Sequence, residues 1–434
     1  MQRVLALVAL TLLATGAARA QDPAPTPWPV SVARDGFTAD QAARVLGQFA
    51  PQQLATGGNQ ALYAYLNMAQ FFPHQVTPRA GGIRVMPRRA HPELVSVRVE
   101  TALGHLTLDA LMNDPRSRMQ GLLVIHHGDI VFERYPGMRE DDSHLWWSVA
   151  KVLAGVLTEL LIDEGQLERD RNVVAYLPEL KSSGWDGVRV GQVLDMTSGI
   201  AALDSAEAYV DPDSGIGGLI HAEGILQAPA GYAAIGHDQA LRRMRSAREP
   251  GTAYGYSSAN TNVLALLIEH ATGQRFGEVV TRRIWSRIGA EGDGLLGLTP
   301  DGRAIAHGMF SSRLRDLGRL GLLFTPSGHD ESVLPRRVLE RITDSGRNQA
   351  YLNTPAAATA AQRRLGERPV NALAQWDALF ADGDLFKSGF DGQALYVSPA
   401  RDVVIAMYAT SKDKSAYAYL REIAARFPVN AARD

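Results

Sequence analysis

Short apolar runs with the composition of β-strands occur in two distant parts of the chain. Residues 121–125 and 130–135 are separated by a turn that contains glycine and aspartate, which predicts a β-hairpin. Residues 394–397 and 403–408 form a second pair close to the C-terminus. We therefore expect α/β architecture whose strands come from segments far apart in sequence.

The chain between these two pairs shows a different periodicity. From about residue 206 to 373, apolar residues recur at helical spacing, for example in 262–272 and 315–324. Strands that bracket a helical insertion are typical of an α/β unit that carries a separate helical lobe. The predicted boundaries are an α/β part over about 116–200 and 374–430 and an all-α lobe over about 201–373.

Three further segments complete the pattern. Residues 152–162 are apolar on almost every side, which is typical of a buried helix, and we expect this helix between the two parts. Residues 415–427 predict an amphipathic C-terminal helix. Residues 21–115 form an N-terminal extension to which the sequence assigns no role, with a helical pattern at 39–49 and a strand-like one at 94–99.

Residues 1–20 have the pattern of a cleavable signal peptide. A basic residue precedes the apolar stretch 4–13, and a small-x-small cleavage site ends at Ala20, before Gln21. The alternative is an N-terminal membrane anchor, but the stretch is short for a bilayer span and polar residues follow it directly. We expect cleavage after Ala20, no membrane span in the mature chain, and a periplasmic or secreted protein.

The composition excludes several classes of function. Hydrophobic residues make up 46% and charged residues 21% of the 434, as in soluble globular proteins. The formal net charge of −2 leaves no basic excess to neutralise phosphates, so we expect no nucleic-acid partner. The sequence has no cysteine, which excludes disulfides, thiolate catalysis, cysteine-ligated zinc and a lipid-modified cysteine.

Ser148 and Lys151 are the first candidates for chemistry. Residues three apart on a helix share a face, so the lysine amine can lie over the serine hydroxyl and remove its proton if burial lowers the pKa of the amine. The apolar helix that follows favours such burial. Ser411 and Lys414 have the same spacing, but they lie in a polar turn. The alternative is that Ser148 only caps the helix while Lys151 points to water.

Two further segments carry groups that this chemistry would use. Tyr256 precedes the helix at 262–272, and a neighbouring ammonium would lower the pKa of its phenol, which could then exchange a proton with serine. In Lys387-Ser388-Gly389, the lysine suits a substrate carboxylate and the glycine allows a substrate to approach the backbone. As alternatives, Tyr256 is a packing aromatic and Lys387 is the surface residue of a hairpin turn.

Other catalytic templates are missing from the sequence. It contains no Gly-x-Ser-x-Gly elbow, no His-Glu-x-x-His pair and no Walker-type glycine loop. His126 and His127 are adjacent, but they fall in the predicted hairpin turn without the further ligands that zinc needs, so we expect a solvent-facing pair. We therefore expect that neither a metal nor another cofactor is required.

Taken in order, these three segments resemble the three motifs of the penicillin-recognising serine hydrolases. That superfamily includes class C β-lactamases, D-alanyl-D-alanine peptidases, esterases with a β-lactamase fold and nylon-oligomer (aminohexanoate-dimer) hydrolases. Loops at 177–180, 196–200, 249–251 and 389–393 are similar to those of the nylon-oligomer group, and the likeness covers about 121–426. It implies a β-lactamase/transpeptidase-like fold, with an antiparallel sheet flanked by helices and an all-α lobe.

The resemblance also implies a role for each matching residue. The matching positions are Ser148 (nucleophile), Lys151 and Tyr256 (shared base), the amides of Ser148 and Phe390 (oxyanion hole) and Lys387-Ser388-Gly389 (third motif, with serine where threonine is common). The implied enzyme cleaves a small ester, amide or peptide through an acyl-enzyme.

Ser258 is where the chain departs from the class C β-lactamases. Those enzymes carry an asparagine at this position, which contacts the side chain of the lactam, whereas the nylon-oligomer and esterase relatives carry serine. Asn260 is displaced by two residues and does not match that asparagine. The departure favours ester or amide hydrolysis over β-lactam hydrolysis.

Two alternatives stay open at the level of sequence. One is a β-lactamase or D-Ala-D-Ala carboxypeptidase, because Lys387 suits a substrate carboxylate. The other is a non-catalytic peptidoglycan-binding relative that kept the fold, although the presence of all three motifs favours an enzyme.

Overall fold

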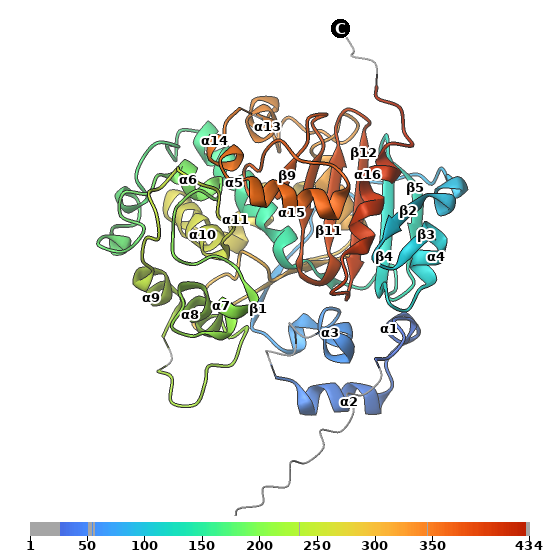
Figure 1. Ribbon diagram of the computed structural model, residues 1–434, viewed down its shortest axis with the longest axis horizontal. Helices are drawn as coiled ribbons and strands as arrows, with labels where there is room; N and C mark the ends of the chain where they lie inside the picture. Colours follow the sequence, from blue (N-terminus) through green and yellow to red (C-terminus); the bar gives the residue numbers. More distant parts are fainter. Residues whose placement is uncertain (1–26, 51–53, 55–56, 234, 345, 431–434) are drawn as a thin grey trace, which may run out of the picture.

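A six-stranded sheet is the main feature of the computed structural model, which describes residues 27–50, 54, 57–233, 235–344 and 346–430 (Figure 1). The predicted signal peptide lies outside the described residues. Neighbouring strands are all antiparallel, as expected. In spatial order they are β5 (Asp129–Arg134), β4 (Met119–His126), β12 (Val403–Ala409), β11 (Ala394–Ser398), β10 (Leu385–Ser388) and β9 (Ala378–Leu379).

The strands from the two distant parts of the sequence meet where β4 pairs with β12. All seven residues of β12 are buried, and successive side chains enter opposite halves of the core. Val404 lies in the cluster with α12 (Leu314–Leu322), and Val403 in the cluster with α16 (Ala418–Ala424). A side chain at Gly321 of α12 would place its Cβ 2.5 Å from Val404, so this glycine allows α12 to lie directly on the sheet.

The apolar helix expected at 152–162 is α5 (Lys151–Asp163), which is buried from its first residue through Leu161. It packs against α10 (Ser258–Thr272). Ser148 lies just before α5, in the 3₁₀ turn η4 (Trp147–Ala150), so the α-helix begins later than Ser148 itself. This arrangement holds Ser148 and Lys151 at one end of a rigid, buried helix.

The N-terminal extension is joined to the rest of the molecule by a second, four-stranded sheet. β1 (His74–Thr77) pairs with β7 (Gly294–Gly297), which pairs with β8 (Phe310–Ser312), and β8 pairs with β6 (His144–Leu145). The helix expected at 39–49 is α2 (Ala39–Gln48). The described residues before β1 also contain α1 (Ser31–Asp35) and α3 (Gly58–Ala64).

The prediction of a strand at 94–99 is wrong for the first half of this segment. Residues Pro92–Ser96 form the 3₁₀ helix η3, because a proline at the first position has the helical φ angle and needs no backbone donor. The strand β2 (Arg98–Thr101) begins only afterwards and forms a hairpin with β3 (Gly104–Thr107). The C-terminal helix is also shorter than expected, since α16 follows the 3₁₀ turn η9 (Ser415–Tyr417).

The helical lobe is less uniform than the sequence predicted. β7 and β8 fall inside the interval 201–373, and α12 covers the main sheet rather than the lobe. The short, glycine-rich β7 has little strand propensity of its own, and it is held between β1 of the extension and β8. The remaining α-helices are α4 (Leu108–Asn113), α6 (Val190–Leu194), α7 (Ala206–Val210), α8 (Gly215–Ala222), α9 (His237–Arg243), α11 (Phe276–Arg283), α13 (Arg336–Thr343), α14 (Gln349–Leu352) and α15 (Pro355–Leu365). Among the described residues, no helix has both the length and the apolar character that a bilayer span requires.

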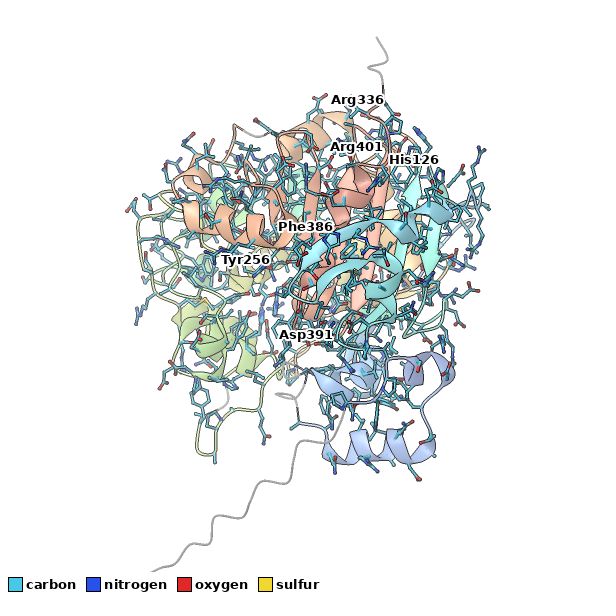
Figure 2. All side chains as sticks on the ribbon, turned by 45° about the vertical axis from the view of Figure 1, so that its right-hand side comes forward. His126, Tyr256, Arg336, Phe386, Asp391 and Arg401 are labelled. Atoms are coloured by element: carbon cyan, nitrogen blue, oxygen red, sulfur yellow. The ribbon has the colours of Figure 1, made fainter. Side chains whose placement is uncertain are left out.

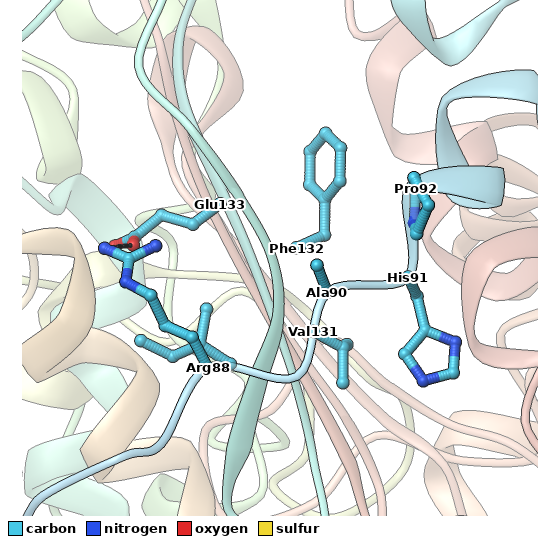
Figure 3. A pocket seen from close by; sticks show the side chains of 8 residues that line it. Arg88, Ala90, His91, Pro92, Val131, Phe132 and Glu133 are labelled. Atoms are coloured by element: carbon cyan, nitrogen blue, oxygen red, sulfur yellow. Dashed lines mark ion pairs between the residues drawn. The ribbon is translucent and has the colours of Figure 1, made fainter.

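The segment before η3 runs along the edge strand β5 (Figure 3). The backbone N–H of Arg89 donates to Ile130 at 2.9 Å, and the guanidinium of Arg88 pairs with Glu133 at 2.6 Å. A pocket lies between this segment and β5, lined by Arg88, Ala90, His91, Pro92, Ile130, Val131, Phe132 and Glu133. None of the candidate site residues lines it, so the pocket belongs to the attachment of the extension.

Candidate active site

Ser148 and Lys151 are in hydrogen-bond contact. The Nζ atom of Lys151 donates to Ser148 Oγ at 2.9 Å, to Ser258 Oγ at 3.0 Å and to the backbone carbonyl of His307 at 2.9 Å. The Lys151 side chain is fully buried, whereas Ser148 is partly exposed. This excludes the alternative in which Lys151 points to water, and it leaves the serine oxygen within reach of both the amine and the solvent.

Burial is the main reason why the pKa of Lys151 falls to about 7. The carboxylate of Asp204 opposes this shift, the ammonium of Lys387 adds to it, and Asp377 and Glu223 oppose it more weakly. Lys151 donates to two hydroxyls and a carbonyl, but to no carboxylate among the described residues. Near neutral pH, much of Lys151 is therefore a neutral amine that can accept a proton from serine.

The ring of Tyr256 lies between two lysines. Its centroid is 5.1 Å from Lys151 Nζ and 4.8 Å from Lys387 Nζ, and Lys387 Nζ donates to its hydroxyl at 3.3 Å. Figure 2 shows Tyr256 where the helices of the central part of the chain approach the sheet. Burial and the charges of Asp377 and Asp204 raise the pKa of Tyr256 well above its ordinary value, although its hydrogen bond with Ser148 lowers it slightly.

The expectation that a lysine would lower the pKa of Tyr256 is therefore wrong. Burial penalises the phenolate, and two carboxylates repel it more strongly than the neighbouring groups stabilise it. The phenol is protonated near neutral pH. It can donate a hydrogen bond or pass a proton on, but it is not a resting base.

Lys387 is a fully buried residue of β10 rather than the surface residue of a turn. Its ammonium pairs with Asp377 Oδ1 at 2.5 Å, while the amide and hydroxyl of Ser388 donate to Asp377 Oδ2 at 2.8 and 2.6 Å. Burial alone would raise the pKa of Asp377, but Lys387 and Ser388 outweigh burial and hold it below its ordinary value. The charge of Lys387 thus already has an anionic partner within the protein.

Ser258 connects Lys151 to a second carboxylate. The Ser258 hydroxyl accepts from Lys151 and donates to Asp204 Oδ2 at 2.6 Å, and the Ser258 amide donates to Asp204 Oδ1 at 2.8 Å. Asn260 is fully buried on the same helix, and its amide lies 3.3 Å from the sulfur of Met196. Asn260 is therefore part of the core.

A buried polar network supports the carbonyl that receives the third hydrogen bond of Lys151. The ring of His307 lies 2.8 Å from Glu223 through its Nε2 atom, and Asn262 donates to the other oxygen of Glu223 at 2.5 Å. Glu223 and Asn262 are fully buried, and His307 nearly so. The network fixes the position of His307 and hence of its carbonyl.

The backbone amides of Ser148 and Phe390 come from two segments that lie against each other. A Cβ at Gly389 would be 2.4 Å from the carbonyl oxygen of Trp146, so the two segments touch where glycine stands. The rings of Trp147 and Phe390 meet edge to face at 5.6 Å. In the described part of the chain, neither amide donates a hydrogen bond to a protein acceptor. Both amides can therefore donate to an oxygen atom of a bound molecule.

The structure brings together all the site residues that the three motifs predicted. Sequence reasoning missed four polar residues that surround them, each an isolated Asp, Glu or His with no motif spacing. They are Asp204, Asp377, Glu223 and His307. The second Ser-x-x-Lys match stays apart, since the described residues show no hydrogen bond between Ser411 and Lys414.

The histidine pair also differs from its prediction. His127 is exposed in the hairpin turn, but His126 is the last residue of β4 and is only partly exposed. The ring of His126 packs on Phe427 at 4.4 Å, and burial lowers its pKa to about 4. The expectation of two solvent-facing histidines is therefore wrong for His126, because the strand extends one residue further than its apolar run.

Comparisons with known proteins bear on the family and the fold. The family model described as Beta-lactamase matches residues 107–427. The 6-aminohexanoate-dimer hydrolase of Paenarthrobacter ureafaciens is 31% identical over 303 residues, which are 67% of this chain and 72% of that protein. Esterase EstB of Burkholderia gladioli is 28% identical over 241 residues, or 50% of this chain and 58% of the esterase. A solved structure from Bacillus anthracis, described as a candidate 6-aminohexanoate-dimer hydrolase, has a TM-score of 0.73 at 23% identity and covers 85% of this chain and 94% of its own.

Proposed function

Since the chain belongs to the Beta-lactamase family of serine hydrolases, we propose that it cleaves a small ester or amide through an acyl-enzyme on Ser148. The observation that carries the proposal is the 2.9 Å contact between Ser148 Oγ and a buried amine whose pKa is lowered to about 7. This pairing activates a serine without a metal or another cofactor.

In the first half of the reaction, Lys151 takes the Ser148 proton while Oγ attacks the substrate carbonyl. The charge that develops on the carbonyl oxygen is received by the amides of Ser148 and Phe390, and one such donor contributes about 3 kcal/mol in other serine hydrolases. Tyr256, protonated at rest, donates its proton to the departing alcohol or amine and is reprotonated by Lys151. Lys151 and Tyr256 thus act as one proton-transfer pair, in which the amine is the base and the phenol carries the proton to the leaving group.

In the second half, the same groups work on water. The neutral pair accepts a proton from a water molecule as the water oxygen attacks the acyl carbon. The bond from this carbon to Ser148 Oγ then breaks, the serine recovers its proton from the pair, and the carboxylic acid leaves. Atoms balance as one ester or amide and one water giving one acid and one alcohol or amine.

The state of Lys387 bears on the class of substrate. Because its ammonium is neutralised by Asp377, it offers little attraction for the carboxylate of a β-lactam or of a D-Ala-D-Ala peptide. Serine at position 258, which is hydrogen-bonded to Lys151 and Asp204, also argues against a β-lactam substrate. We therefore favour esters or amides that carry no carboxylate beside the scissile bond over the β-lactamase and carboxypeptidase alternatives.

A labelling experiment tests the proposal. Purified protein is treated with a fluorophosphonate, analysed by intact mass, and assayed with p-nitrophenyl butyrate, 6-aminohexanoate dimer and nitrocefin. We expect one covalent adduct on Ser148, turnover of the ester or amide, and little turnover of nitrocefin. Loss of both the adduct and turnover in Ser148→Ala completes the expected result. An enzyme that labels and turns over equally well without Ser148 refutes the assignment, and a wild type that does neither favours the non-catalytic alternative.

We propose further that the protein is exported, with its signal peptide cleaved after Ala20. The support is the sequence pattern of residues 1–20. Expression in a Gram-negative host, osmotic-shock fractionation and mass spectrometry of the N-terminus check this. A periplasmic chain that begins at Gln21 is expected, and a chain that keeps residues 1–20 in the cytoplasm contradicts it.

A further inference from the structure

Both amides of the proposed oxyanion hole adjoin a residue with an unusual backbone conformation. Trp147, directly before Ser148, has a φ of 48°, and Asp391, directly after Phe390, has a φ of 57°. Residues other than glycine rarely adopt these angles, at a cost of about 1–3 kcal/mol each, and keep them only where their surroundings hold them. Trp147 forms the peptide that carries the Ser148 amide, and Asp391 anchors the C-terminal side of Phe390, so the positions of both amides depend on what fixes Trp147 and Asp391.

Tyr65 of the N-terminal extension contacts both residues. It follows directly after α3 and is fully buried. The edge of its ring meets the ring of Trp147 at 5.7 Å, and its hydroxyl lies 3.0 Å from Asp391 Oδ2. Its backbone carbonyl accepts the N–H of Leu145 at 2.8 Å, so Tyr65 is also tied to the segment that leads to Ser148. Figure 2 shows Asp391 on the side of the molecule where the N-terminal helices lie.

The hydroxyl of Tyr65 is held in place on its other side. It also lies 3.0 Å from the backbone carbonyl of Leu54, another residue of the extension, so its single proton is shared between two acceptors. Burial raises the pKa of Asp391 to about 6, although Tyr65 lowers it, so the carboxyl is ionised above this pH and accepts the tyrosine hydroxyl. Tyr65, Trp147, Phe390 and Asp391 thus form a closed set of contacts around the two amides.

We propose that Tyr65 is a positioning residue that aims the amides of Ser148 and Phe390 at the same substrate oxygen, so that the N-terminal extension completes the oxyanion hole. The inference rests on the proposed function, since it assigns a role to Tyr65 within that reaction. It also gives the extension, whose role the sequence left open, a direct connection to the chemistry.

The test separates this role from a purely structural one. In a thionoester, sulfur replaces the carbonyl oxygen, and amides aimed at an oxyanion stabilise sulfur poorly. The ratio of kcat/KM for a p-nitrophenyl ester to that for its thionoester therefore reports on the oxyanion hole. Tyr65→Phe keeps the ring and removes the hydroxyl. We expect kcat for the ester to fall about tenfold with KM nearly unchanged, and the oxygen-to-sulfur ratio to fall by a similar factor.

The chain provides a matched control in Tyr63→Phe. Tyr63 lies in the last turn of α3, two residues before Tyr65, and is buried, but its hydroxyl bonds to Gln70 at 3.0 Å rather than to Asp391. We expect this variant to keep the wild-type ratio. Asp391→Gly, which removes the acceptor and still permits a positive φ, should lower the ratio as Tyr65→Phe does, and the double variant should lose no more than either single one.

The outcomes distinguish this inference from the proposed function. If the wild type labels at Ser148 and turns over, but Tyr65→Phe leaves the oxygen-to-sulfur ratio unchanged, the positioning role is wrong and the hydrolase assignment stands. The same conclusion follows if Tyr65→Phe slows ester and thionoester equally, because that pattern indicates a general loss of structure. Circular dichroism melting of each variant identifies any that does not fold, and Asp391→Gly then supplies the second measurement of the ratio.

Discussion

Two buried lysines lie close to the ring of Tyr256, and they differ in their partners. Lys151, at the start of the buried helix α5, donates to two hydroxyls and a carbonyl, and its pKa falls to about 7. Lys387, on strand β10, pairs with Asp377 at 2.5 Å. Burial holds the pKa of Lys387 below its ordinary value too, and the charge of Asp377 and its hydrogen bond offset part of this shift.

The comparison shows that burial alone does not decide what a lysine does. Removing an ammonium from water favours the neutral amine, and a carboxylate at contact distance favours the charged form again. The helix side of the site therefore provides a proton acceptor, while the sheet side provides a fixed ion pair. Tyr256 lies between them, and the carboxylates of Asp377 and Asp204 keep it protonated.

The largest effect that tests this comparison is expected for Lys151→Met. We expect kcat/KM to fall about 10³- to 10⁴-fold, because the serine loses its proton acceptor while the apolar side chain fills the same space. Stability should not fall: the folded pKa of Lys151 lies below its ordinary value of 10.5, so at neutral pH folding must remove a proton that methionine does not carry. Steady-state kinetics and thermal melting measure both. A variant that keeps a tenth of the activity would contradict the role of Lys151 as the base.

Lys387→Met should lower the stability of the protein strongly, in contrast to Lys151→Met. Breaking a buried ion pair by removing one partner typically costs about 3–5 kcal/mol, since the remaining charge is left uncompensated. Denaturant unfolding measures the change in the free energy of unfolding. The double variant Lys387→Met/Asp377→Leu, which removes both charges, should recover part of the loss. If Lys387→Met unfolds at the wild-type denaturant concentration, the pair is not the fixed element that we describe.

The sequence predicted the fold and the motif residues well because both depend on local patterns. Strand β12 is recognisable as a continuous apolar run, and α5 as a helix that is apolar on every side. The Ser-x-x-Lys spacing itself places Ser148 and Lys151 within one turn of each other. Such features need no knowledge of how distant segments pack.

The residues that the sequence did not predict are those whose role depends on packing between distant segments. Asp377 acts through β10, and Asp204 acts through α10, whose first residue it holds. β7 is a strand because it pairs with β1 of the extension on one side and with β8 on the other, and Tyr65 reaches Asp391 across 326 positions of sequence. The pKa of Tyr256 was predicted in the wrong direction for the same reason, since neither carboxylate is close to it in the sequence motif.

The pH dependence of activity sharpens the difference between the two lysines. Because the neutral amine of Lys151 is the proton acceptor, kcat/KM should rise with pH up to about 7 and level off above it. Asp204 is the largest influence that holds this pKa up, so Asp204→Asn should move the profile to lower pH and raise the activity at pH 6, relative to the plateau, by up to about tenfold. Asp213→Asn makes the same charge change on the surface and should leave the profile unmoved. A shift of the Asp204→Asn profile to higher pH would refute the electrostatic account.

The smallest expected effect is a change of substrate preference in Asp377→Asn. Without the internal anion, the ammonium of Lys387 becomes available to a carboxylate on the substrate, an interaction worth about 1 kcal/mol at a separation of about 4 Å when water screens it fully. The ratio of kcat/KM for nitrocefin, which carries a carboxylate, to that for p-nitrophenyl butyrate should therefore rise about threefold to fivefold, and less at high salt. Asp382→Asn is the matched control, because Asp382 pairs with Arg421 at 3.0 Å and is not part of the site. If both variants change the ratio equally, the neutralisation of Lys387 by Asp377 does not set the preference, and serine at position 258 remains the reason for it.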